Sequence, residues 1–113
     1  MRTVLVVDDD PMVLELTAGM LEDLGCDVLV ASSPTEALAK LGANPKIEIL
    51  ITDVNMPGLA GYELAERAKR MRPGLQAILL SGRETEGRGL PLIRKPFLET
   101  DLRRVMSKTT GLC

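Results

Sequence analysis

Short apolar runs alternate with longer amphipathic stretches along this chain of 113 residues. The runs have the length and composition of β-strands and lie at residues 4–7, 27–31, 47–52, 77–80 and 90–94. Strands that alternate with helices predict an α/β fold, with a parallel sheet, right-handed crossovers and helices on both faces. Residues 49–51 are apolar without alternation, as expected of a central strand that is covered on both faces. The length suits one domain with one core, residues 1–113.

The stretches between the runs carry the start and stop signals of helices. Asp10 and Pro11 supply an N-cap and a proline at the first helical position, and Gly25 ends that helix. Ser33 and Glu36 form a capping box for the next helix. Apolar residues recur at helical spacing in three stretches: Val13, Leu16, Met20 and Leu24; Leu64, Ala68 and Met71; and Leu98, Leu102, Val105 and Met106. Polar, glycine-rich residues 82–89 lack this spacing and predict a loop, or at most one frayed turn.

Composition excludes several classes of function. A formal net charge of -2 argues against binding to nucleic acid or to an anionic membrane, because such proteins carry a basic patch or stripe. No stretch resembles a membrane span or a signal peptide, so we expect a cytoplasmic protein. The absence of histidine excludes a Ser-His-Asp triad, a histidine metal site and a phosphohistidine on this chain itself. Cys26 and Cys113 follow no metal or redox spacing, and we expect both thiols to be free.

Four of the predicted strands end on residues suited to handling a phosphoryl group. Asp8 and Asp9 follow the first strand, Asp53 the third, Ser81 the fourth and Lys95 the fifth. The carboxyl ends of parallel strands meet at one edge of a sheet, where open α/β folds bind their ligands. Each residue alone is more simply a cap, a turn or a loop residue. Together at four strand ends they predict a site.

The chemistry of such a site follows from its charges. Carboxylates about 4 Å apart repel each other by roughly 4 kcal/mol at an effective dielectric constant near 20, so three of them need a cation or raised pKa values. Mg²⁺ suits the set because it prefers oxygen ligands and pairs carboxylates with phosphate. A carboxylate can then attack a phosphoryl group in line. We expect Asp53 to be this nucleophile because it ends the central strand, with Lys95 and Ser81 contacting the phosphoryl oxygens.

These motifs together closely resemble one family. Residues 6–11, 52–58, 81–82 and 95–97 resemble the receiver domain of two-component response regulators, in order and over the whole chain. The resemblance implies a flavodoxin-like (βα)5 fold, a three-layer sandwich with a five-stranded sheet in the order 2-1-3-4-5. It also implies that Asp53 is phosphorylated by a partner histidine kinase or histidine phosphotransfer protein. Phosphorylation would switch a surface that binds a downstream protein, whose identity the sequence does not give.

The same resemblance implies a role for individual residues in metal binding. Asp9 and Asp53 would bind Mg²⁺ directly, together with the backbone carbonyl of Asn55. Asp8 would act through a coordinated water.

The resemblance also implies roles at the phosphoryl group. Lys95 would contact it, next to a cis Lys95–Pro96 peptide, and Ser81 stands at the position of the family's switching hydroxyl. Asn55 and Arg83 match positions that tune how long the phosphoryl group survives.

Two features depart from the family pattern. The segment 82–94 is short, so the fourth helix is expected to be short or absent, and Leu92 stands where an aromatic switch residue is usual. Similar shortening occurs in single-domain receivers and in receivers of hybrid histidine kinases. The chain shows no output domain, so we expect neither promoter binding nor turnover of an external substrate, although it would assist its own phosphorylation and dephosphorylation.

Two other functions fit parts of the pattern. A haloacid-dehalogenase-like phosphatase also uses an aspartyl nucleophile, but its second aspartate, two residues later, is Asn55 here. A phosphorylation-independent receiver-like interaction module would keep the acidic residues without the switch, and the short loop and Leu92 leave this alternative open.

Overall fold

The computed structural model of the protein describes residues 2–83, 88–109 and 111. Within these residues the strands are β1 (Thr3–Val7), β2 (Asp27–Ala31), β3 (Ile47–Asp53), β4 (Gln76–Ser81) and β5 (Leu92–Arg94). The helices are α1 (Pro11–Asp23), α2 (Pro34–Ala43), α3 (Gly61–Met71) and α4 (Glu99–Thr109). All neighbouring strands are parallel, in the order β2-β1-β3-β4-β5, which confirms the predicted topology and the central position of β3.

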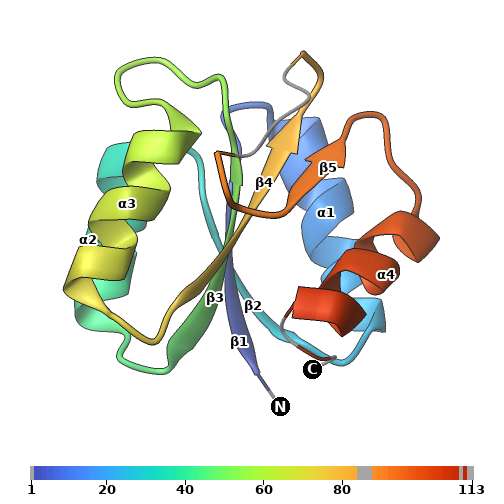
Figure 1. Ribbon diagram of the computed structural model, residues 1–113, viewed down its shortest axis with the longest axis horizontal. Coiled ribbons are helices and arrows are strands. Elements are labelled where there is room, and N and C mark those ends of the chain that lie inside the picture. The colour runs from blue at the N-terminus through green and yellow to red at the C-terminus, as the bar shows by residue number, and fades with distance from the viewer. Residues whose placement is uncertain (1, 84–87, 110, 112–113) are drawn as a thin grey trace.

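Helices cover both faces of the sheet, as predicted for a flavodoxin-like three-layer fold. Figure 1 shows α2 and α3 on one face and α1 and α4 on the other. Alternate residues of each central strand pack against opposite faces of the sheet. Leu5 and Leu50 pack toward α2 and α3, whereas Val6 and Ile51 pack toward α1 and α4. Burial on both faces explains why these strands are continuously apolar.

The predicted capping signals work as expected in α1 and α2. Asp10 Oδ1 accepts a hydrogen bond from the N–H of Met12 at 2.9 Å, and Ser33 Oγ accepts one from the N–H of Glu36 at 3.1 Å. The carboxylate of Glu36 accepts from the N–H of Ser32, one residue before the N-cap, at 2.7 Å. Both helices therefore begin where the sequence predicts.

The connection from β4 to β5 differs from the others. None of its described residues, 82–83 and 88–91, lies in a helix, which agrees with a fourth helix that is short or absent. Residues 84–87, where one frayed turn was possible, lie outside the described residues. We call the connection from residue 82 to residue 91 the β4–β5 crossover.

The sequence-based prediction of which helix residues face the core is partly wrong. Leu16 is 61% exposed, and Thr17 and Leu21 are the buried residues of α1. The Thr17 hydroxyl donates to a carbonyl one turn earlier at 2.7 Å, so a polar side chain can occupy the core face without losing a hydrogen bond. Met71 and Leu98 are also exposed, because each lies at or beyond the end of its helix.

The expectation of two free thiols is contradicted at Cys26. The structure gives this buried cysteine as disulfide-bonded. Disulfide formation depends on the spatial approach of two cysteines, which the spacing along the chain does not reveal. Cys113, the other cysteine of the sequence, lies outside the described residues. Of the helices in the described part of the chain, none combines the length and apolarity that a membrane crossing requires.

Candidate functional site

Three carboxylates gather where β1 and β3 end. Asp8 and Asp9 follow β1, and Asp53 is the last residue of β3. Each offers an oxygen that lies within 4.8 Å of those of the other two. Asp8 and Asp53 are buried, with 1% and 6% of their surface exposed, whereas Asp9 is exposed. The cluster therefore has a buried floor and one side open to solvent.

Lys95 joins this cluster from β5, on the far side of β4. Its Nζ lies 2.9 Å from Asp8 Oδ2 and 3.1 Å from Asp53 Oδ1. The backbone N–H of Lys95 donates to the carbonyl of Ser81 at 2.8 Å, which fixes the residue beside the end of β4. The Lys95–Pro96 peptide is cis, as the resemblance implied. The predicted lysine therefore contacts two of the three predicted carboxylates.

Burial and the charge of the partner residue shift the pKa values of Asp53 and Lys95 in opposite directions. Burial raises the pKa of Asp53 above its ordinary value, although the neighbouring charge of Lys95 opposes the change. Burial alone would lower the pKa of Lys95, but its hydrogen bond to Asp8 and the charge of Asp53 outweigh burial and raise that pKa. Lys95 is therefore held as an ammonium. Its single positive charge does not balance the three carboxylates of the cluster.

The remaining predicted residues lie at the same edge of the sheet in different settings. Ser81 is fully buried at the end of β4, and its Oγ accepts a hydrogen bond from the N–H of Arg83 at 3.1 Å. Arg83 itself is exposed in the β4–β5 crossover. Asn55 is exposed in the loop two residues after Asp53. The described contacts thus link Ser81 to Lys95, whereas the roles implied for Asn55 and Arg83 stay predictions.

Sequence reasoning missed Gly61. This residue begins α3, and its N–H donates to the carbonyl of Val54 at 2.8 Å. A Cβ at this position would lie 2.2 Å from the carbonyl oxygen of Asp53. The start of α3 therefore rests directly on the peptide of the buried carboxylate. A glycine in the first turn of a helix, where it weakens the helix, was the available signal.

The donor set fits a hard divalent cation. Asp8, Asp9 and Asp53 supply carboxylate oxygens, and the backbone nearby can supply a carbonyl. Mg²⁺ prefers such oxygen ligands and keeps part of its water shell, which the exposed side at Asp9 permits. Two buried carboxylates beside one ammonium leave negative charge that a cation would offset.

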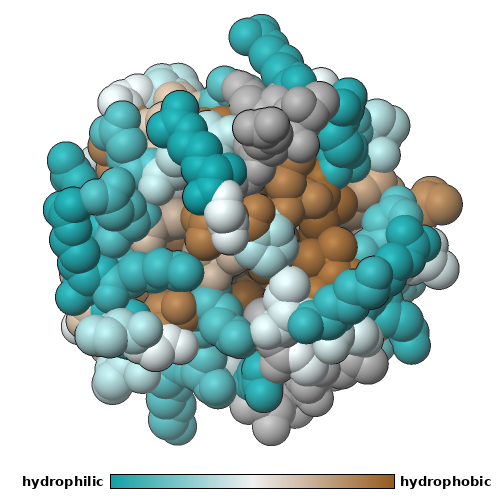
Figure 2. Space-filling view, viewed as in Figure 1, coloured by the Kyte–Doolittle hydropathy of each residue, from teal (hydrophilic) through white to brown (hydrophobic). Residues whose placement is uncertain are grey.

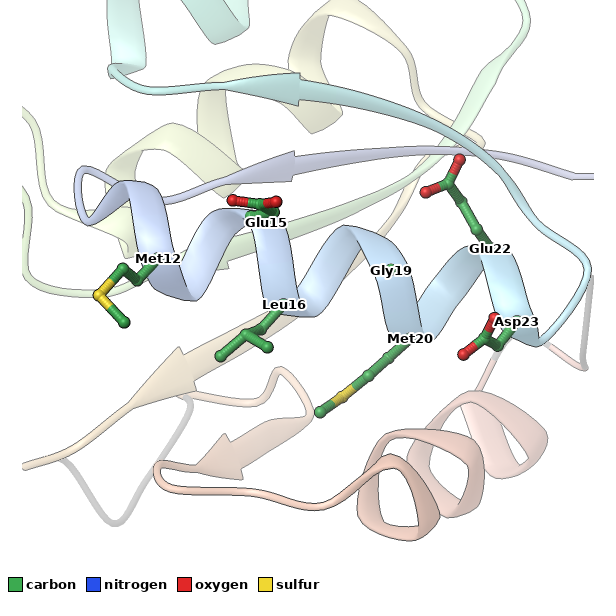
Figure 3. Close-up of a pocket in the computed structure, with 7 residues that line it drawn as sticks. All are labelled: Met12, Glu15, Leu16, Gly19, Met20, Glu22 and Asp23. Atoms are coloured by element: carbon green, nitrogen blue, oxygen red, sulfur yellow. The ribbon is translucent and has the colours of Figure 1, made fainter.

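Two grooves border α1. One, of about 670 Å³, is lined by residues of α1 itself, and Figure 3 shows Met12, Leu16 and Met20 along one side of the helix. The other, of about 300 Å³, runs between α1 and the segment after β5 and is lined by Leu16, Met20, Lys95 and Phe97, among others. We call the second the α1 groove. Because Lys95 lines it, the α1 groove adjoins the carboxylate cluster.

Comparison with known families gives one clear match. The family described as the response regulator receiver domain matches residues 4–107 of this chain. A response regulator receiver protein from Anaeromyxobacter sp. (strain Fw109-5) is 37% identical over 81 residues, which is 72% of this chain. The match spans only 34% of the length of that relative.

Solved structures agree with the family match. A receiver domain protein from Clostridium thermocellum has a TM-score of 0.86 at 31% identity, over 96% of this chain and 93% of that one. The response regulator TrrA from Thermotoga maritima, solved with Mg²⁺ and BeF, has a TM-score of 0.84 at 28% identity, over 96% and 98% of the two chains. TrrA was also solved in complex with the histidine kinase ThkA; that match has a TM-score of 0.83 at 28% identity and covers 96% and 97%.

Proposed function

Since the chain belongs to the response regulator receiver domain family, we propose that Asp53 accepts a phosphoryl group from a partner phosphohistidine. Receiver domains are signalling domains of two-component systems. One observation carries the proposal for this chain: the buried carboxylate of Asp53 contacts the Lys95 ammonium and lies within 4.8 Å of two further carboxylates. The phosphorylated form would present a changed surface to a downstream protein.

The proposed step is an in-line transfer between two nucleophiles. A carboxylate oxygen of Asp53 attacks phosphorus, a P–O bond forms, and the P–N bond to histidine breaks. The imidazole takes the electron pair of that bond, and solvent supplies its proton. Lys95, 3.1 Å from Asp53, donates to the phosphoryl oxygens, and the Ser81 hydroxyl is a second donor at the same edge of the sheet.

We propose that Asp8, Asp9 and Asp53 hold Mg²⁺, together with the backbone carbonyl of Asn55. When bound, the ion offsets charge on the carboxylates and on the transferred group. TrrA, a structural neighbour solved with Mg²⁺ and BeF, supports this assignment. Asp8 is the most buried of the three and accepts a hydrogen bond from the N–H of Asp10 at 3.0 Å, which orients its carboxylate.

We propose a histidine kinase or histidine phosphotransfer protein as the phosphoryl donor. The α1 groove adjoins the reacting group through Lys95 and offers an apolar surface for a helix of the donor. The complex of TrrA with the kinase ThkA supports such a partner. We propose that the protein acts in the cytoplasm. Asn55 in place of a second aspartate argues against a phosphatase, and we expect no turnover of an external substrate.

Labelling with acetyl phosphate tests the proposal. With Mg²⁺, we expect an adduct of one phosphoryl group on Asp53 that is stable in acid and cleaved by hydroxylamine, and loss of the adduct on chelation of the metal. Asp53→Asn should abolish labelling, whereas Asp23→Asn, at an exposed position of α1, should not. Undiminished labelling of Asp53→Asn would refute the assignment. A protein that folds but takes no label would favour the phosphorylation-independent module.

A further inference from the structure

We infer that the phosphoryl donor docks on α1 through a helix that carries lysine or arginine beside its apolar row, and that this helix crosses α1 at Gly19. The inference rests on the proposed function, because it names the chemistry that the donor must offer. Its basis is the groove of about 670 Å³ that is lined by residues of α1 alone. We call this the outer groove. It shares Leu16 and Met20 with the α1 groove, so the two form one continuous surface.

One border of the outer groove is a row of apolar side chains that face solvent. Met12 is 72% exposed and Leu16 is 61% exposed, and Figure 3 shows both on the same side of α1 as Met20. Their spacing of four residues is that of the anchors in helix-in-groove recognition. The solvent side of α3, in contrast, is mostly hydrophilic, as Figure 2 shows. The row on α1 therefore offers a surface that another helix can cover.

The other border of the outer groove is acidic and has no counter-charge. Glu15 and Glu22 are exposed, and Figure 3 shows them pointing away from Leu16 and Met20. α1 contains no lysine or arginine, and among the described residues neither glutamate takes part in an ion pair. Glu22 lies in the last turn, where the helix dipole disfavours a negative charge. A basic partner would convert this unfavourable placement into an attraction.

Gly19 lies between the two glutamates, about one turn from each. Its φ is not positive, and a Cβ at this position would meet nothing within 4 Å. Neither the backbone conformation nor packing within the protein therefore requires a glycine, although glycine weakens the interior of a helix. A missing side chain on the solvent side of a helix instead permits close approach of another backbone from outside.

A basic helix of another protein suits this surface better than a second copy of the chain. In a two-fold contact the same patch meets itself, so that Glu15 and Glu22 of the two copies would lie together without a cation. A donor helix of the inferred kind would cover the apolar row, place its charges beside the glutamates and cross at Gly19. Because the outer groove continues into the α1 groove, which Lys95 lines, such a helix would extend toward the reacting group.

Phosphotransfer from a kinase tests the close approach at Gly19. The probe is the phosphorylated histidine kinase that profiling of the kinases of the source organism identifies, and the quantity is kcat/KM for transfer to this protein. Gly19→Ala should lower kcat/KM about tenfold, since the added methyl group separates the two backbones. Its Tm should be no lower than that of the wild type, which excludes unfolding as the cause. Gly42→Ala, in the last turn of α2 on the opposite face of the sheet, is the matched control and should accept the phosphoryl group like the wild type.

Salt dependence tests the charge of the donor helix. Glu15→Gln and Glu22→Gln should each lower kcat/KM about two- to fivefold at low salt, because each removes one exposed charge pair with the donor. The loss should disappear at about 1 M salt, where the Debye length is about 3 Å. Glu63→Gln, at an exposed position of α3, is the control and should have no effect at either salt concentration.

Transfer to Gly19→Ala at the wild-type rate would overturn the inference. Unchanged or faster transfer to both Glu15→Gln and Glu22→Gln would overturn it as well, because the donor helix would then not be basic. A wild-type dimer that Gly19→Ala dissociates would assign the groove to a second copy instead. Failure of the proposed function has a different signature: acetyl phosphate would not label the wild type, or would still label Asp53→Asn. If acetyl phosphate labels Asp53 but no kinase transfers to it, the function stands and the docking inference fails.

Discussion

Asp53 is an acid whose burial opposes its ionisation. Its pKa is raised by burial, so the ionised form present at neutral pH lowers the free energy of unfolding. An uncharged amide at this position would not have this effect. We expect Asp53→Asn to stabilise the metal-free protein at neutral pH by about 1 kcal/mol, or about 4–8 °C in Tm.

The pH dependence of this difference follows from the direction of the shift. As the pH falls through the raised pKa, folded Asp53 takes up a proton before the unfolded chain does, and the wild type recovers stability. The difference in stability between the wild type and Asp53→Asn should therefore approach zero toward about pH 4. Thermal melts in chelator at several pH values measure it, with Asp23→Asn as the exposed control. A gap that widens on acidification would show that the pKa of Asp53 is lowered instead.

Gly61 illustrates a backbone requirement set by one neighbouring atom. A methyl group at this position would overlap the Asp53 carbonyl oxygen, which is backbone and cannot rotate away. We expect Gly61→Ala to destabilise the protein by about 1–3 kcal/mol in urea unfolding. Gly19→Ala is the matched control: it lies inside α1 with nothing within 4 Å, so it should stabilise by about 0.5–1 kcal/mol. Equal effects at both glycines would contradict the close packing.

Helix α1 has an exposed apolar side next to the reacting group. Leu16 lines the α1 groove although it is 61% exposed. If a helix of the phosphoryl donor occupies this groove, Leu16→Glu should slow phosphotransfer from the kinase about tenfold, which corresponds to about 1.4 kcal/mol. Labelling by acetyl phosphate should be unchanged, because a small donor needs no docking surface.

The control for this prediction is another exposed apolar residue. Met71→Glu alters α3, on the opposite face of the sheet, and should not affect either reaction. The kinase for the assay can be found by phosphotransfer profiling of the histidine kinases of the source organism. Equal slowing by Leu16→Glu and Met71→Glu would place the docking surface elsewhere.

The elements show which patterns in the sequence carry structural information. The strands, the central place of β3 and the starts of α1 and α2 could be predicted, because continuous apolar runs and capping residues report local requirements. The full strand order was implied only by the resemblance to the receiver family. The buried face of α1 could not, because Thr17 satisfies its hydroxyl within the helix and so replaces an apolar residue in the core. The disulfide at Cys26 and the close contact of Gly61 with the Asp53 peptide depend on how segments approach in space, which periodicity does not encode.

The candidate site likewise has features that the sequence could predict and features that it could not. Strand ends predicted that Asp8, Asp53 and Lys95 would meet, since parallel topology alone brings them to one edge. The sequence did not predict that Lys95 would bridge the two carboxylates at 2.9 and 3.1 Å, because side-chain conformation decides that contact. Nor did it predict the stack of Arg88 on Tyr62, whose partners lie on separate elements.

We expect the concentration of acidic charge at one edge to make global stability depend on a divalent cation. A ligand that binds the folded state alone stabilises it by RT ln(1 + [L]/Kd), about 2.7 kcal/mol at a hundred times Kd. We expect Mg²⁺ at that level to raise the urea midpoint of the wild type without changing the slope of the transition, since the fold and its buried surface stay the same.

Asp8→Asn and Asp53→Asn should each lose most of this gain, because each removes one member of the carboxylate cluster. Asp23→Asn should keep it, and Ca²⁺ or an equal concentration of Na⁺ distinguishes a selective site from general screening of surface charge. If Na⁺ at matched ionic strength stabilised the wild type as much as Mg²⁺ does, the cluster would be an ordinary acidic surface. The chemistry proposed for Asp53 would then lack the cation on which it depends.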